Sequence, residues 1–204
     1  MAVRKRKKTV LKIFQKVALI ALIMGAVIII YPFFTDFYAW HYTNQRLQEL
    51  ESPRLEPPPG FAERDFICET EFTGAVLKIP AIGLITVVEK GTSQQVLAKA
   101  VGWYEESMLP GEGNTAIAGH RTMYGGKFKN IHLLKFGDII TLEYRGKIYT
   151  YTVDKVFSVK STDWSIIESR DYPTLTLTTC YPGDNYTRRV VIANMITETD
   201  DIMK

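Results

Sequence analysis

The longest apolar stretch of the chain lies near its N-terminus. Residues 17–34 (VALIALIMGAVIIIYPFF) contain no charged side chain. A helix of this length rises about 1.5 Å per residue and so reaches about 27 Å, close to the thickness of a bilayer's hydrocarbon core. Tyr31, Tyr38, Trp40 and Tyr42 suit the membrane interface at its far end. The pattern predicts one transmembrane helix over residues 17–34.

The alternative interpretation of this stretch is a cleavable signal peptide. Such peptides have an apolar region of about 7–15 residues that ends in a small-x-small cleavage site. Here the run is longer and ends in bulky residues, namely Tyr31, Pro32, Phe33 and Phe34. We therefore expect an anchor that is retained in the mature protein.

The rest of the chain predicts a stalk followed by one folded domain. Residues 35–73 begin with a polar segment of weak helical spacing and continue into a proline-rich linker, which favours an extended spacer. A single domain of ordinary size is expected over residues 74–196, with a short tail over 197–204. Residues 1–16 form a basic tail ahead of the apolar run.

Short runs rich in β-branched and aromatic residues dominate the expected domain. They predict strands at residues 75–80, 84–89, 114–119, 138–144, 147–160, 174–180 and 188–196. Arg145-Gly146 marks a hairpin between two of these runs, and short helices are expected at residues 93–99, capped by Ser93, and at 129–135. The predicted fold class is mostly β: a single closed barrel of seven to eight strands with short helices, preceded by one transmembrane helix.

Charge is distributed unevenly along the chain, so the formal net charge of +3 does not describe the expected domain. Residues 1–16 contain seven basic side chains and no acidic one, so the remainder carries 18 basic against 22 acidic side chains, a net charge of −4. A nucleic-acid-binding domain would spread Lys and Arg over a folded face, so we expect no nucleic-acid partner. Basic residues on one side of the apolar run predict a single-pass protein with a cytoplasmic N-terminus and an extracellular domain.

Few side chains of the domain can carry chemistry. Its cysteines and histidines are Cys68, Cys180, His120 and His132, and they lack the CxxC or HxxxH spacing of a structural zinc site. Cys180 ends one predicted strand and His120 directly follows another. If those strands are parallel neighbours, the thiol and the imidazole share one rim of the barrel. A disulfide between Cys68 and Cys180 is the alternative, since an extracytoplasmic compartment permits one.

A guanidinium completes this set of candidate groups. Past the loop at residues 181–187, the chain returns as a strand that opens with Arg188-Arg189, so a hairpin brings an arginine beside the thiol. A thiolate is the attacking species in acyl transfer, an imidazole can protonate a leaving amine, and a guanidinium can stabilise an oxyanion. Taken singly, each residue also has a purely structural interpretation, as a buried small side chain, a hydrogen-bonded histidine or a solvated strand-edge charge.

These segments resemble the sortases, the membrane-anchored cysteine transpeptidases of Gram-positive cell surfaces. The nucleophile signature T-L-x-T-C of that family is present at residues 176–180 (TLTTC). The histidine segment of the family resembles residues 113–121 (GNTAIAGHR), and its arginine precedes an aliphatic run, as at residues 189–192 (RVVI). The resemblance covers residues 74–196.

The resemblance implies a function and a role for each candidate residue. Cys180 would attack the Thr–Gly bond of an LPxTG-like sorting signal on a surface protein, and an amine acceptor such as a cell-wall precursor would complete the transfer. His120 would act as general acid and base. Arg189, or Arg188 if the alignment is off by one, would support the oxyanion. Thr178 and Thr179 would line the site, and no cofactor or metal is expected.

The resemblance also narrows the class of enzyme. The linker lacks an Asp-Pro-aromatic element like the lid of pilus-building sortases, which favours class D or class A over class C. Papain-like hydrolases place their cysteine before their histidine, and the Ser-His-Gly-Cys cluster of L,D-transpeptidases is absent around Cys180. The alternative function is a membrane-tethered, non-catalytic β-domain that binds peptides or surface proteins.

Overall fold

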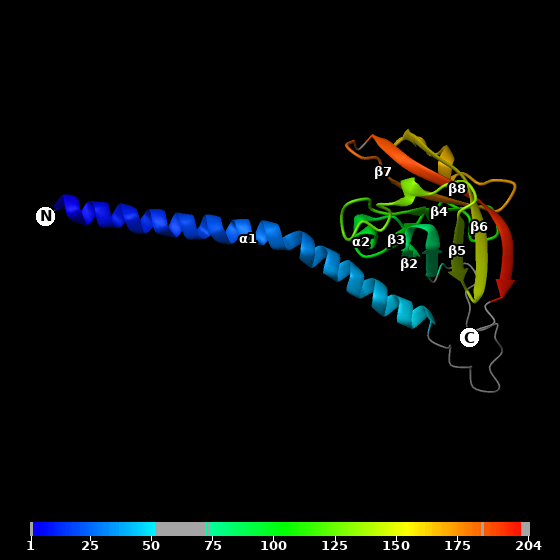
Figure 1. Cartoon of the computed structure of the whole chain (residues 1–204), viewed down its shortest axis with the longest axis horizontal. Coiled ribbons are helices and arrows are strands. Elements are labelled where there is room, and N and C mark those ends of the chain that lie inside the picture. Colours follow the sequence, from blue (N-terminus) through cyan, green and yellow to red (C-terminus); the bar gives the residue numbers. More distant parts are fainter. Residues whose placement is uncertain (1, 52–71, 73, 185, 201–204) are drawn as a thin grey trace, which may run out of the picture.

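The computed structural model describes residues 2–51, 72, 74–184 and 186–200. Its two parts are a long N-terminal helix, α1 (Ala2–Glu51), and a β-barrel that lies against the last part of this helix (Figure 1). The linker residues 52–71 and the end of the expected tail, residues 201–204, lie outside the described residues.

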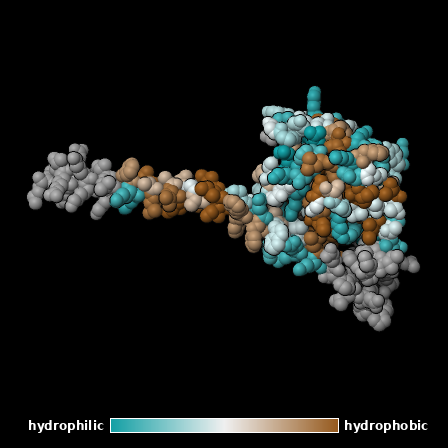
Figure 2. Space-filling model, in the orientation of Figure 1, coloured by the Kyte–Doolittle hydropathy of each residue, from teal (hydrophilic) through white to brown (hydrophobic). Residues whose placement is uncertain are grey.

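Helix α1 is continuous through what the sequence suggested were a tail, a membrane span and a stalk. Residues 14–34 leave nearly all of their side chains exposed, and Figure 2 shows much of this stretch as apolar surface. Within the described residues, α1 is the one helix whose length and composition suit a membrane span. The N-terminal apolar helix predicted from the sequence is thus present as a candidate anchor.

Eight strands form the closed barrel, in the spatial order β1-β2-β3-β4-β7-β8-β6-β5. They are β1 (Ala75–Ile79), β2 (Leu84–Lys90), β3 (Val101–Trp103), β4 (Asn114–Ala118), β5 (Ile139–Tyr144), β6 (Lys147–Lys160), β7 (Thr174–Cys180) and β8 (Thr187–Asp200). The seven strands that the sequence pattern predicted are all present, and the mostly β barrel is confirmed. Strand β8 continues through residues 197–200, which the sequence analysis had placed in the tail.

Strand β3 was missed because three residues show no alternation. The middle residue of β3, Gly102, has to be glycine for a packing reason: a Cβ there would come within 2.2 Å of the carbonyl oxygen of Gly91. The hairpin between β5 and β6 was predicted correctly. Arg145 and Gly146 both have positive φ angles, 52° and 74°, as the two central residues of a type I′ turn require.

The helical segments of the barrel domain are short. Helix α2 (Gln94–Leu97) begins as expected, with the Ser93 hydroxyl accepting a hydrogen bond from the Val96 amide at 3.3 Å. The others are the 3₁₀ turns η2 (Pro80–Ile82), η3 (Ile131–Leu133) and η4 (Ser165–Ile167). The two helical turns expected at 129–135 are reduced to η3, because Phe128, Ile131 and Leu134 recur every third residue and all three are buried in the core.

Two apolar clusters lie on opposite sides of the barrel wall. The larger fills the interior and includes Leu175 and Leu177 of β7 and Val191 of β8. The smaller lies on the outer face, where η4 covers β4 and β8. It consists of Ala116, Ile166, Ile167, Val190 and Ile192. Because successive side chains of a strand point to opposite faces, the interior residues of β7 leave Cys180 on the outer face.

Candidate active site

Parallel pairing of β4 with β7 brings His120 beside Cys180. The register places Ala118 next to Thr178, and the Gly119 amide continues the ladder by donating to the Thr178 carbonyl at 3.1 Å. Cys180 is two residues further along β7, and His120 is two residues past the end of β4. Continuing the strand alternation through Gly119 puts both side chains on the outer face. The parallel arrangement that the sequence left conditional is therefore present, and thiol and imidazole share one end of the barrel. We call this end, where β4 and β7 end and β8 begins, the Cys180 rim.

The two arginines differ in register. In the antiparallel pair of β7 and β8, Arg188 lies opposite Cys180 and Arg189 lies opposite Thr179. Residues directly opposite each other point to the same face. The guanidinium of Arg189 instead lies over the ring of Tyr181, 5.0 Å from its centroid. The sequence resemblance favoured Arg189 as the arginine of the site. The strand pairing instead puts the alternative, Arg188, on the face of the thiol.

The two threonines expected to line the site also point to different faces. Thr178 shares the face of Cys180, and its hydroxyl lies 3.1 Å from the hydroxyl of Tyr104. Thr179 points the other way and donates to the Gly119 carbonyl at 2.7 Å, which ties β7 to β4 one residue before His120. The structure therefore gives Thr179 a part in holding the two strands together, and leaves Thr178 on the face of the candidate site.

Burial sets the protonation behaviour of His120. The imidazole is partly buried, and this desolvation lowers the pKa of His120 from its ordinary value, because the charged form loses hydration. Its Nε2 is buried and has no hydrogen-bond partner among the described residues. Tyr124 lies 5.5 Å away, centroid to centroid. A neutral imidazole with an unpaired nitrogen can exchange a proton with a group that enters the site.

Cys180 is a free cysteine of intermediate exposure, and Cys68 lies outside the described residues. Within the described part of the chain, no three His, Cys, Asp or Glu side chains gather in a way that could hold a metal ion.

A buried asparagine that the sequence analysis overlooked holds the wall of the site. The Nδ2 of Asn114 donates to the carbonyls of Ile166 and Glu168, both at 2.9 Å, and its Oδ1 accepts from Thr174 at 3.2 Å and Thr176 at 2.7 Å. These bonds join β4, β7 and the connection that carries η4. An asparagine at the start of a strand gives no sequence signal for such a network, because its partners lie more than 50 residues away.

The sequence profile of the sortase domain matches residues 77–196. Sortase A of Bacillus anthracis is 24% identical over 202 residues, which are 92% of this chain and 96% of that protein. Sortase SrtE1 of Streptomyces coelicolor is 28% identical over 141 residues, 61% of this chain and 40% of that protein.

Solved structures show the same fold. The sortase E structure from Streptomyces avermitilis is 33% identical with a TM-score of 0.57, covering 62% of this chain and 89% of that one. The Clostridium perfringens Sortase D5 transpeptidase is 26% identical with a TM-score of 0.62, covering 78% and 99%. Sortases named A, C, D and E are among the similar proteins, so the choice between classes A and D stays a prediction.

Proposed function

Because this chain belongs to the sortase family of cysteine transpeptidases, we propose that it cleaves an LPxTG-like sorting signal between Thr and Gly and transfers the new carboxyl end to an amine. The observation that carries this proposal is the register of β4, β7 and β8, which aligns His120, Cys180 and Arg188 across three neighbouring strands on one face. A relative, Sortase E1 of Streptomyces coelicolor, has been solved with a tripeptide in its active site. A peptide substrate suits the Cys180 rim, where Cys180 is partly exposed.

In the proposed first step, the Sγ of Cys180 attacks the threonine carbonyl carbon. The thiolate is the reactive form, and the neutral imidazole of His120 takes up the thiol proton as Sγ attacks. The new S–C bond gives a tetrahedral intermediate whose oxygen carries negative charge. Arg188, on the same face, stabilises that charge, and arginine suits this role because it stays ionised at every physiological pH.

Collapse of the intermediate breaks the C–N bond to glycine. His120 gives its proton to the leaving amine, which departs with the C-terminal fragment and leaves a thioester on Cys180. An incoming amine then attacks the thioester and loses a proton to His120, and the thiolate is released. The unpaired Nε2 of His120 is consistent with this exchange, since no described residue occupies the nitrogen.

The helix α1 supplies the proposed location. We expect residues 17–34 to span the cell membrane with the basic residues of 1–16 in the cytoplasm, so that the barrel lies outside the cell. The expected partners are surface proteins that carry the sorting signal and an amine acceptor such as a cell-wall precursor.

A cleavage assay tests the proposal. The full chain in detergent is mixed with a fluorogenic LPxTG-type peptide, alongside the Cys180→Ala variant. We expect cleavage by the wild-type chain and none above background by the variant. Equal rates would contradict the proposal, and an inert thiol with peptide binding retained would favour the non-catalytic β-domain.

A further inference from the structure

Helix α1 runs along the barrel in the direction away from the Cys180 rim. At the rim, the Gly125 amide, in the loop that follows His120, donates to Asp36 Oδ1 at 2.6 Å. Further along, Tyr42 and Arg46 both reach Glu89 near the end of β2. Strand β2 is parallel to β3, and β3 is antiparallel to β4. Strand β4 runs toward the rim, so β2 runs away from it. The order of these contacts gives the direction of the helix along the barrel.

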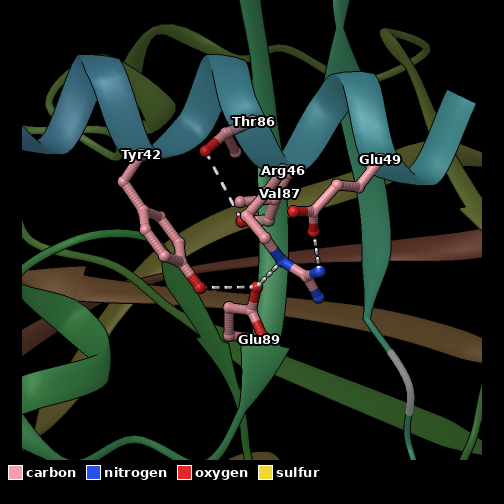
Figure 3. Close-up of polar contacts among 6 residues, drawn as sticks. All are labelled: Tyr42, Arg46, Glu49, Thr86, Val87 and Glu89. Carbon is pink, nitrogen blue, oxygen red and sulfur yellow. Dashed lines mark hydrogen bonds and ion pairs between the residues drawn. The ribbon is translucent and has the colours of Figure 1, made fainter.

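The contact between α1 and β2 fixes the helix against the barrel wall. The Tyr42 hydroxyl donates to Glu89 Oε1 at 3.0 Å, and Arg46 Nε donates to the same oxygen at 2.9 Å (Figure 3). Lys99 lies over the Tyr42 ring, 4.8 Å from its centroid. Ala39 and Thr43, one helical turn apart, are 0% and 3% exposed. The sequence placed Tyr42 in an aromatic belt at the membrane, whereas its hydroxyl is engaged by the barrel.

This direction decides which end of the barrel lies nearest the bilayer. The apolar run ends at Phe34, and Asp36 follows after two residues, a rise of about 3 Å along the helix. The contact between Asp36 and Gly125 therefore lies at the edge of the membrane segment. In Figure 1 the N-terminal part of α1 extends away from the barrel. The Cys180 rim thus lies next to the membrane, and the opposite end of the barrel lies farthest from it.

The chain between β4 and β5 gives the rim an apolar and basic surface. Both strand ends that it joins lie at the rim. Strands β6 and β7 are both antiparallel to β8 and therefore run in the same direction, and β5 is antiparallel to β6. Strand β5 thus begins at the end of the barrel where β4 and β7 end. Three large apolar side chains of this segment are exposed: Met123 by 49%, Leu133 by 55% and Phe136 by 83%. Residues 121–137 also hold four basic side chains and no acidic one, in a chain whose net charge after residue 16 is −4. Two of them, Lys129 and Lys135, are exposed, and the other two, Arg121 and Lys127, are partly buried.

We propose that residues 121–137 form a membrane-contacting surface that lies against anionic lipid headgroups, so that Cys180 acts on substrates within a few residues of the bilayer. Basic side chains are attracted to the negative surface of a membrane, and exposed apolar side chains can enter its interfacial region. The inference rests on the proposed anchoring by α1. Beyond that anchoring, the inference states which side of the barrel faces the lipid. The partner of this surface is a bilayer and not a protein.

The direct test measures how close each end of the barrel comes to lipid headgroups. Single cysteines replace Met123, Phe136 or Thr199 in the full chain carrying Cys68→Ala and Cys180→Ala, and each is labelled with an environment-sensitive dye. Thr199 is exposed on β8 near the end opposite the rim, which makes it the matched control. The proteins are placed in phosphatidylcholine–phosphatidylglycerol vesicles that contain a headgroup-attached spin-label quencher.

We expect quenching at positions 123 and 136 to be at least about threefold stronger than at 199. The seven residues of β7 alone span about 23 Å, so a dye near the opposite end of the barrel lies well away from the headgroups at the rim. Equal quenching at all three positions, or the strongest quenching at 199, would overturn the inference. A dye at 123 that is shielded from water but not quenched would indicate a protein partner and would also overturn it. A chain that fails to float with the vesicles would refute the anchoring itself.

A second measurement separates the inference from the proposed chemistry. Lys129 and Lys135 are exposed, and the double variant Lys129→Glu with Lys135→Glu reverses half of the basic charge of the segment. On anionic vesicles we expect cleavage of a lipid-tethered sorting peptide to fall about tenfold or more, with cleavage of the free peptide unchanged. Lys155→Glu, an exposed β6 position, is the control. An equal fall for both peptides would overturn the inference, and no cleavage of either by wild type would refute the chemistry.

Discussion

Arg188 lies directly opposite Cys180 in the antiparallel pair of β7 and β8, whereas Arg189 lies opposite Thr179. The side chains of opposed residues share a face, so the pairing separates two adjacent arginines that the sequence alone could not distinguish. Arg188 lies on the face of the thiol, and the guanidinium of Arg189 lies over Tyr181.

Alanine substitutions of the two arginines should therefore have unequal effects on catalysis. We expect Arg188→Ala to lower kcat/KM for the sorting peptide by about 10²–10³, the usual cost of losing an oxyanion-stabilising group. Arg189→Ala should cost less than about tenfold, since its side chain lies on the other face. Steady-state kinetics on the two variants measures the difference. A larger loss at Arg189 would contradict the assignment made from the register.

The sequence could not supply this register. The six residues between β7 and β8 admit pairings that differ by one position, and the aliphatic run after the arginines fits either of them. The register also depends on the pairing of β8 with β6, which shifts at Thr150/Tyr151 and at Val153/Lys155. Such irregularities reflect packing between residues distant in the sequence.

The protonation of His120 gives a second prediction. Burial lowers its pKa in the folded state, so the unfolded chain takes up a proton at a higher pH than the folded chain does. The free energy of unfolding should therefore fall as the pH drops from the unfolded value, about 6.5, through the folded pKa of His120. Denaturant unfolding of wild type and His120→Gln over this window measures the effect.

The His120→Gln variant should lose this part of the pH dependence, since a glutamine does not titrate. An NMR titration of the wild-type chain should show an imidazole resonance, absent from the variant, that titrates below pH 6.5. A His120 titration above that value would show that a nearby negative charge outweighs burial.

The asparagine network predicts a large effect on stability at a position outside the reacting groups. Asn114→Ala leaves two buried threonine hydroxyls and two carbonyls without their partner, so we expect the free energy of unfolding to fall by about 2–4 kcal/mol. Asn130→Ala, at an exposed position, is the control and should cost about 0.5 kcal/mol or less. Chemical denaturation measures both. Similar small losses would mean that water replaces the network.

The bond between Thr179 and Gly119 predicts that the two threonines differ in role. Thr179→Val removes a buried hydrogen bond that joins β7 to β4, and we expect it to lower the free energy of unfolding by about 1–2 kcal/mol. Thr178→Val should change the KM for the peptide more than Thr179→Val does, because Thr178 shares the face of Cys180. Denaturation and kinetics on the pair check this, and the reverse pattern would place the site on the other face.

Alternation of apolar and polar residues was sufficient to place seven strands, since each is long enough to bury one face. The position of His120 and Cys180 followed from strand ends and needed only the parallel pairing to bring them together. The docking of α1 was not predictable. Its contacts join Asp36, Tyr42 and Arg46 to residues more than 40 positions away, and a polar segment with weak helical spacing gives no sign of them.

The central claim is that Cys180 forms a thioester with the peptide it cleaves. Intact-protein mass spectrometry after rapid acid quenching of the full chain with an LPxTG-type peptide measures this directly. We predict an adduct with the mass of the peptide through its threonine, located on Cys180 by fragmentation and removed by an added amine. Cleavage without any adduct, or an adduct on another residue, would contradict the account.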